Sequence, residues 1–227
     1  MELRINNKVI NIYGYGSKLK KLPVIILNTF DNEGKDVFLE CQKLNCKPFL
    51  LVTIGNIDWN NELTPWECEP LFKNEEKYGG KASIYLKELE SDIIPKVSNY
   101  ILDNYHKEIS YYGICGYSLG GLFSLYALYN STLFQRYASI SGSLWYPNFI
   151  EYALEKVFHQ NVDKVYLSLG DKESNTKNII LAKVEDNTKC LYDNLKDKIN
   201  SLYEENPGNH FQDANLRVAK GIKWLVS

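Results

Sequence analysis

Apolar and polar residues alternate over the first thirteen positions, and longer apolar runs follow them. The alternation in ELRINNKVINIY, interrupted at Asn6 and Asn7, predicts two antiparallel strands joined as a hairpin. The runs LPVIILN (22–28) and PFLLVTI (48–54) are continuous, which is typical of strands buried on both faces. Residues 35–44 between them carry apolar side chains at helical spacing. The chain is therefore expected to open with a hairpin and a strand–helix–strand unit.

The alternation of strands and helices continues along the rest of the sequence. Helical periodicity covers residues 81–105, where Pro95 is expected to kink or end the helix. Further strands are expected at 108–116, 137–142, 164–170 and 201–205, and further helices at 121–130, 149–158, 187–199 and 213–226, the last opened by Asp213 as N-cap. Residues 55–80 show no sustained period, and a loop of that length is usually functional. The pattern predicts one α/β domain, residues 1–227, with a mostly parallel central sheet and helices on both faces.

Composition and charge exclude several classes of protein. The hydrophobic fraction of 44% and the charged fraction of 24% are those of a globular protein. A net charge of −2 with dispersed lysines favours no nucleic-acid partner. No stretch reaches the roughly 18 apolar residues of a membrane span and no signal-peptide pattern opens the chain, so a cytoplasmic location is expected. The five cysteines lack CxxC spacing, which predicts neither disulfides nor a zinc site; no metal or other cofactor is expected.

Residues 116–120, Gly-Tyr-Ser-Leu-Gly, fit the pattern G-x-S-x-G between a predicted strand and a predicted helix. In this pattern the serine occupies a sharp, strained turn, and the glycines allow close packing around it. Ser118 would then be presented at the edge of the sheet, beside the free amide groups of a helix N-terminus. The N–H of Leu119 would face the oxyanion of a tetrahedral intermediate. A glycine-rich turn can also be purely structural, so a partner base has to be identified.

Three histidines are available as that base, and their order in the chain separates them. Where a serine of this kind is catalytic, the acid follows a late strand and the histidine follows the last one. His106 precedes Ser118, and His159 precedes the acids that follow the strand at 164–170. His210 fits, because it lies in the turn-rich segment NPGNHF just before the last helix. A neutral imidazole there would take the serine proton and return it to the leaving group. The alternative is an ordinary surface-loop histidine.

Two acidic residues directly follow the strand at 164–170. Their side chains alternate in direction, so we expect only one of them to reach His210. Glu173 is the preferred acid, because its spacing from Gly170 lets the loop turn over the edge of the sheet, and Asp171 is the alternative.

A second oxyanion donor is expected from the loop that follows the strand at 22–28, since that loop lies beside the serine turn. The loop reads NTFDNEG and has no glycine-rich donor sequence. The backbone N–H of Thr29 or Phe30 is the predicted donor, although Thr29 is equally suited to starting a turn.

Five segments resemble the blocks of one enzyme family, in the expected order: NELTPW, GICGYSLGGLFSLYAL, SISGSLWY, LSLGDKE and NPGNHFQD. Over most of its length the chain resembles the esterase D-like, enterochelin esterase-like family of α/β hydrolases. That family also includes S-formylglutathione hydrolases, feruloyl esterases and mycolyltransferases. The resemblance implies an α/β-hydrolase fold and an esterase site formed by Ser118, Glu173 and His210. The loop NTFDNEG departs from the family, in which a more glycine-rich or DG turn is common.

Aromatic residues near these segments predict the substrate pocket, with Tyr117, Trp145 and Trp66 as its lining. A general abundance of tyrosine is the competing explanation. We interpret the chain as a serine carboxylic-ester hydrolase that acts through an acyl-enzyme on a small or aromatic ester. One alternative is a siderophore esterase for a catecholate trilactone, which the presence of only three arginines disfavours. Acyl transfer to an alcohol and a non-catalytic binding module with a hydrolase fold are the others.

Overall fold

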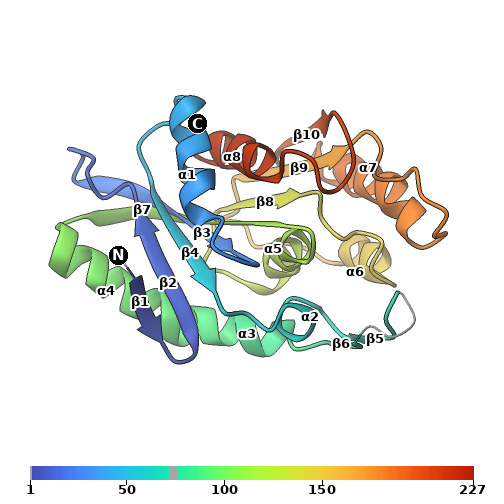
Figure 1. Ribbon diagram of the computed structural model, residues 1–227, viewed down its shortest axis with the longest axis horizontal. Helices are drawn as coiled ribbons and strands as arrows, with labels where there is room; N and C mark the ends of the chain where they lie inside the picture. The colour runs from blue at the N-terminus through green and yellow to red at the C-terminus, as the bar shows by residue number, and fades with distance from the viewer. Residues whose placement is uncertain (1, 72–75) are drawn as a thin grey trace.

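A central sheet runs through the computed structural model, which describes residues 2–71 and 76–227 (Figure 1). Within these residues the sheet has eight strands, in the order β1 (Glu2–Ile5), β2 (Lys8–Tyr13), β4 (Leu50–Gly55), β3 (Lys21–Asn28), β7 (Glu108–Tyr117), β8 (Arg136–Ile140), β9 (Lys164–Gly170) and β10 (Asn200–Asn206). Strands β1 and β2 form an antiparallel hairpin, and β2 is antiparallel to β4. All strand pairs from β4 to β10 are parallel. The predicted α/β fold with its N-terminal hairpin is confirmed.

Helices cover both faces of the sheet. On one face α1 (Gly34–Lys43) packs against α8 (Ala214–Leu225), and the two helices lie side by side in Figure 1. The other face is covered by α3 (Ala82–Glu88), α4 (Ile94–Tyr105), α5 (Leu119–Asn130), α6 (Phe149–Glu155) and α7 (Val184–Leu195). Because both faces are buried, the central strands are continuous apolar runs in the sequence.

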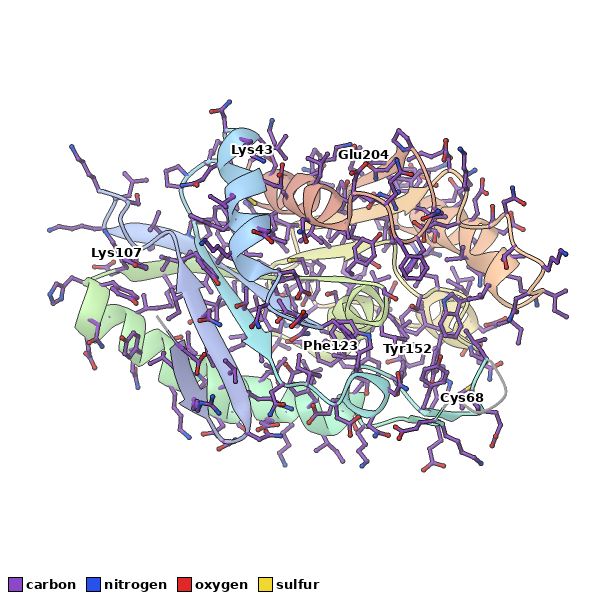
Figure 2. All side chains as sticks on the ribbon, in the orientation of Figure 1. Lys43, Cys68, Lys107, Phe123, Tyr152 and Glu204 are labelled. Carbon is purple, nitrogen blue, oxygen red and sulfur yellow. The ribbon has the colours of Figure 1, made fainter. Side chains whose placement is uncertain are left out.

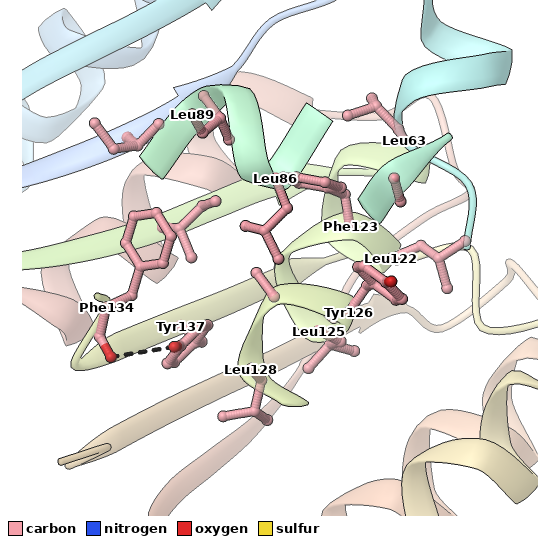
Figure 3. Close-up of a cluster of buried hydrophobic side chains, with 14 of the residues drawn as sticks. Leu63, Leu86, Leu89, Leu122, Phe123, Leu125, Tyr126, Leu128, Phe134 and Tyr137 are labelled. Atoms are coloured by element: carbon pink, nitrogen blue, oxygen red, sulfur yellow. Dashed lines mark hydrogen bonds between the residues drawn. The ribbon is translucent and has the colours of Figure 1, made fainter. Parts of the chain in front are cut away.

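Helix α5 lies deep in the core. Every residue from Leu119 to Leu128 is buried, and Leu86, Leu89 and Tyr137 belong to the same apolar cluster (Figure 3). In Figure 2 Phe123 of this helix lies inside the molecule, whereas Lys43 projects outward from α1. Since α5 begins directly after Ser118, its burial fixes the position of that serine.

The helix expected at 81–105 contains a π-helical turn, η1 (Leu89–Ile93), between α3 and α4. The N–H of Ile94 bonds to the carbonyl of Leu89, five residues earlier. Pro95, which has no N–H to donate, follows this shift in the hydrogen-bond ladder. Pro95 therefore does not end the helix, which continues as α4 to Tyr105, and the irregularity in the helix includes the π-helical turn that precedes the proline.

In α8, Asp213 occupies the N-cap position as expected, but its side chain makes no capping hydrogen bond.

The segment predicted as a long loop at 55–80 carries short elements: α2 (Trp59–Glu62), β5 (Glu67–Cys68) and β6 (Tyr78–Gly79). Residues 72–75 of that loop lie outside the described residues. The fully buried ammonium of Lys8 pairs with the Glu62 carboxylate, which ties the N-terminal hairpin to α2. Among the helices the structure describes, none is both long enough and apolar enough to cross a bilayer.

Candidate active site

Ser118 occupies the turn between β7 and α5. Its φ of 56° and ψ of −121° lie in a region that residues other than glycine rarely adopt. Gly116 permits this turn, because a Cβ on it would lie 2.3 Å from the carbonyl group of Gly120. The Ser118 N–H donates to the Ile140 carbonyl at 3.1 Å, which anchors the turn to β8. The strained strand-to-helix turn expected from G-x-S-x-G is therefore present.

His210 reaches Ser118 from the loop between β10 and α8. Its Nε2 lies 3.1 Å from Ser118 Oγ, within hydrogen-bond distance. The Tyr117 hydroxyl donates to the backbone carbonyl of His210 at 2.6 Å and so fixes the loop. The carboxyl ends of parallel strands lie at one edge of a sheet, which explains why these distant residues meet.

Glu173 follows β9 and contacts the other nitrogen of the imidazole. Its Oε2 lies 2.7 Å from His210 Nδ1. Asp171, the alternative acid, instead accepts a hydrogen bond from the Gly208 N–H at 2.7 Å. Asp171 therefore holds the loop that carries His210, and Glu173 contacts the ring itself.

The second carboxylate oxygen of Glu173 is also occupied. It accepts hydrogen bonds from Ser141 Oγ and the Gly170 N–H, both at 2.7 Å. Burial raises the pKa of the Glu173 carboxyl. The hydrogen bond and the charge interaction with His210 lower this pKa, as do the hydrogen bonds from Ser141 and the Gly170 N–H. Together they outweigh burial and hold the pKa of Glu173 below its ordinary value. With Glu173 ionised, His210 Nδ1 carries the proton and Nε2 is left to accept one from Ser118.

Arg217, on α8, joins the acid to the histidine loop. Its side chain is 1% exposed, and its NH1 group donates to Glu173 Oε1 at 2.9 Å. Its NH2 group donates to the carbonyls of Pro207 and Asn209, at 2.9 and 3.0 Å. No role for Arg217 was predicted from the sequence. Its place on the apolar face of α8, four residues before the buried Gly221, could have indicated that this arginine is buried and therefore paired.

The predicted oxyanion donors differ in their availability. The Leu119 N–H stands at the N-terminus of α5, where backbone amides lack intrahelical acceptors. The Thr29 N–H, in contrast, donates to the Ile54 carbonyl at 2.9 Å. The Phe30 N–H donates to the Glu33 carboxylate, also at 2.9 Å. The expectation that Thr29 or Phe30 offers a free backbone donor is therefore wrong for this structure.

Asn28, the last residue of β3, was missed by the sequence analysis. Its side-chain oxygen accepts a hydrogen bond from the Tyr85 hydroxyl at 2.7 Å. Its side-chain nitrogen is buried and has no partner within the part of the chain that the structure describes. Buried amide donors are rarely left unpaired, so this nitrogen requires an explanation.

Two cavities meet at Ser118 and His210, and Phe211 borders both. The first, which we call the Trp59 cavity, has a volume of about 420 Å³. Besides these three residues it is lined by Leu27, Asn28, Phe30, Asp31, Glu33, Val37, Trp59, Tyr117, Ala214, Asn215 and Val218. The second, the Trp145 cavity, has a volume of about 430 Å³. Its lining includes Tyr78, Ser141, Gly142, Trp145, Glu173, Thr176, Leu181 and Val184.

Two of the three predicted pocket residues line these cavities, Tyr117 the first and Trp145 the second. Trp66 lines neither. Its indole N–H donates to the Pro147 carbonyl at 3.0 Å, and its ring packs against Phe149 and Tyr152, the latter labelled in Figure 2. Trp66 therefore serves packing. Within the described residues all five cysteines are free, and no group of three or more His, Cys, Asp or Glu is arranged to hold a metal ion.

A serine, a histidine and a carboxylate in hydrogen-bonded series at the carboxyl edge of a parallel sheet are the arrangement of α/β-hydrolase serine enzymes. The fold is the α/β-hydrolase fold. The chain belongs to the family described as "Putative esterase", whose model matches residues 4–214. The family resemblance expected from the sequence is confirmed.

Comparison with known proteins shows how far the similarity extends. The IroE-like serine hydrolase from Shewanella oneidensis has a TM-score of 0.76 at 19% identity, covering 96% of this chain and 75% of that one. The siderophore hydrolase EstA from Aspergillus nidulans has a TM-score of 0.74 at 18% identity, covering 96% of this chain and 89% of that one. The uncharacterized protein YbbA from Bacillus subtilis strain 168 is 32% identical over 151 residues, 65% of this chain and 60% of YbbA. The match therefore spans less than two thirds of YbbA.

Proposed function

We propose that the protein hydrolyses carboxylic esters through an acyl-enzyme on Ser118. The observation that carries this proposal is the hydrogen-bonded series from Ser118 Oγ through His210 to Glu173, at 3.1 and 2.7 Å. His210 Nε2 takes the hydroxyl proton as Ser118 Oγ attacks the ester carbonyl carbon, and then gives that proton to the departing alcohol. Water next attacks the acyl-enzyme and gives a proton to His210 Nε2, which passes it to Ser118 Oγ as the acid is released.

The oxyanion of each tetrahedral intermediate is proposed to lie between the Leu119 N–H and the side-chain amide of Asn28. Asn28 is paired with Gly116 across β3 and β7, which places it beside the serine turn. It also lines the Trp59 cavity together with Ser118, and its amide nitrogen is buried without a partner. The hydrogen bond from Tyr85 holds its oxygen, leaving the amide protons available for negative charge.

Covalent labelling tests the nucleophile directly. A fluorophosphonate should label Ser118, and Ser118→Ala should abolish both labelling and hydrolysis of a p-nitrophenyl ester. Ser143 is the matched control, because its hydroxyl lies 3.3 Å from Ser118 Oγ. Ser143→Ala should retain labelling. Label found on Ser143, or ester hydrolysis that survives Ser118→Ala in the folded protein, would overturn the assignment.

A siderophore ester is a second candidate for the substrate. The siderophore hydrolase EstA shares the fold over 96% of this chain, which favours this candidate. A catecholate trilactone and a simple aryl ester, incubated separately with the same enzyme, would decide it by mass spectrometry of the released acids. Hydrolysis of the trilactone at a higher kcat/KM than the aryl ester supports a siderophore substrate, and hydrolysis of the aryl ester alone opposes it.

A further inference from the structure

The residues described around the two cavities at Ser118 form no cationic wall. Within the described residues, no lysine or arginine lines the Trp59 cavity or the Trp145 cavity. The guanidinium of Arg217 lies beneath the site, where it is buried and paired with the Glu173 carboxylate at 2.9 Å. Its charge is therefore already opposed before any substrate binds.

The Trp59 cavity instead carries two carboxylates that the proposed mechanism does not use, those of Asp31 and Glu33. Glu33 accepts hydrogen bonds from the backbone N–H groups of Phe30 and Asp31, each at 2.9 Å, and so shapes the loop after β3. The Asp31 carboxylate is exposed and has no hydrogen-bond or ion-pair partner in the described residues. The cavity wall therefore has an excess of negative charge.

Aromatic rings complete the same wall. Phe30 is 76% exposed, and its ring meets Trp59 edge to face, with centroids 5.4 Å apart. Phe211, at the boundary of the two cavities, is 90% exposed. Aromatic faces bind apolar groups and attract organic cations, and carboxylates strengthen the attraction to cations. An anionic group would meet like charges here, and none of the described lining residues is an arginine or lysine that could neutralise it.

We infer that the protein selects esters whose group in the Trp59 cavity is uncharged or cationic, and that it discriminates against esters carrying an anion there. This inference rests on the proposed esterase function. It assigns the discrimination chiefly to Asp31, because Glu33 is engaged by the backbone. The Trp145 cavity then holds the group on the other side of the ester bond.

Two sets of three matched esters test the inference. All share one scaffold, and the three members of a set carry a methyl, a trimethylammonium or a sulfonate group at one end, which is the acyl end in one set and the alcohol end in the other. In at least one set, the kcat/KM of the wild-type protein should be lowest for the anionic ester. The kcat/KM of the cationic ester should equal or exceed that of the neutral ester. The ratio of cationic to anionic kcat/KM should fall as salt is added, because exposed charges are screened.

Asp31→Asn removes the charge without removing a contact found in the structure, and should lower the cationic-to-anionic ratio by about 2- to 5-fold. Asp36→Asn is the matched control, since Asp36 is an exposed acid on α1 that lines neither cavity, and it should leave the ratio unchanged. If the neutral esters are not hydrolysed at all, the proposed function fails. If they are hydrolysed and the anionic ester is processed equally well in both sets, the esterase stands and this inference is overturned. An unchanged ratio in Asp31→Asn also overturns it.

Discussion

Arg217 is the residue whose replacement best tests how the site is held together. Arg217→Met keeps the length and the apolar stem of the side chain but removes the guanidinium. Five hydrogen bonds are lost: to Glu173, to the hydroxyls of Tyr117 and Ser141, and to the carbonyls of Pro207 and Asn209. The variant therefore uncouples the acid from the loop that carries His210.

The cost of this change follows from burial. The Glu173 side chain is 3% exposed, and removing one partner of such a buried pair costs about 3–5 kcal/mol, because the remaining charge is uncompensated. For a chain of this size, that loss lowers Tm by roughly 6–20 °C. Since the histidine loop also loses its two carbonyl anchors, we expect kcat to fall by about 10²-fold, as for other small misplacements of catalytic groups. KM should change little, because Arg217 lines neither cavity.

Urea denaturation and steady-state kinetics would measure both effects, and the pH profile separates them. Without the cation, Glu173 is protonated at a higher pH, so the acid limb of kcat/KM should move to higher pH in Arg217→Met. Arg217→Lys retains a charge but cannot donate to the carboxylate and both carbonyls with one planar group. Its stability and kcat should therefore lie between those of the wild type and those of Arg217→Met. A folded Arg217→Met protein with wild-type kcat and an unshifted pH profile would refute the reasoning.

Two further predictions concern the oxyanion and the acid. Asn28→Asp keeps an oxygen to accept the Tyr85 hydrogen bond but removes the amide donor, so kcat should fall by about 10²–10³-fold while fluorophosphonate still labels Ser118 slowly; an unchanged kcat would show that Asn28 is not a donor. For Glu173, the pKa lies below its ordinary value of 4.5 in the folded protein, so the unfolded chain binds the extra proton as the pH falls. The stability contributed at neutral pH should then begin to fall near pH 4.5 and be lost as the pH drops through the lower pKa of the folded state, so the urea midpoint of the wild type should fall more between pH 7 and pH 4 than that of Glu173→Gln. Equal losses in the two proteins would contradict this.

Hydrophobic periodicity was sufficient to predict the strands of the central sheet and the helices that cover it, because burial on one or both faces determines that pattern, but it did not reveal the short elements α2, β5 and β6. Chain order was enough to select His210 as the partner of Ser118 and to place the acid after β9, but it left Asp171 as the alternative to Glu173. Parallel strands end at a common edge, so Ser118, Glu173 and His210, each following a different strand, were expected to meet there, and the structure brings them together.

The parts of the site that were not predicted depend on partners that are distant in sequence. The Thr29 N–H is occupied because β4 lies alongside β3 and offers the Ile54 carbonyl, which no local pattern reveals. The role of Arg217 depends on its contacts with residues that follow β8, β9 and β10, and these contacts are not visible in the local sequence of α8. Trp66 lies in a segment without periodicity, where sequence alone does not distinguish a ring that packs from one, such as Trp59, that lines a cavity.

The position of Arg217 on α8 also sets the order in which the enzyme can become active during its synthesis. Chains emerge from the ribosome N-terminal end first, and the serine turn, with the buried helix behind it, is complete long before α8 is made. A nascent or truncated chain that lacks α8 holds Ser118 in its turn but has no cation opposite Glu173 and no anchor for the His210 loop. Chains that lack α8 should therefore be inactive even where their sheet has formed, so that activity reports a chain synthesised through α8.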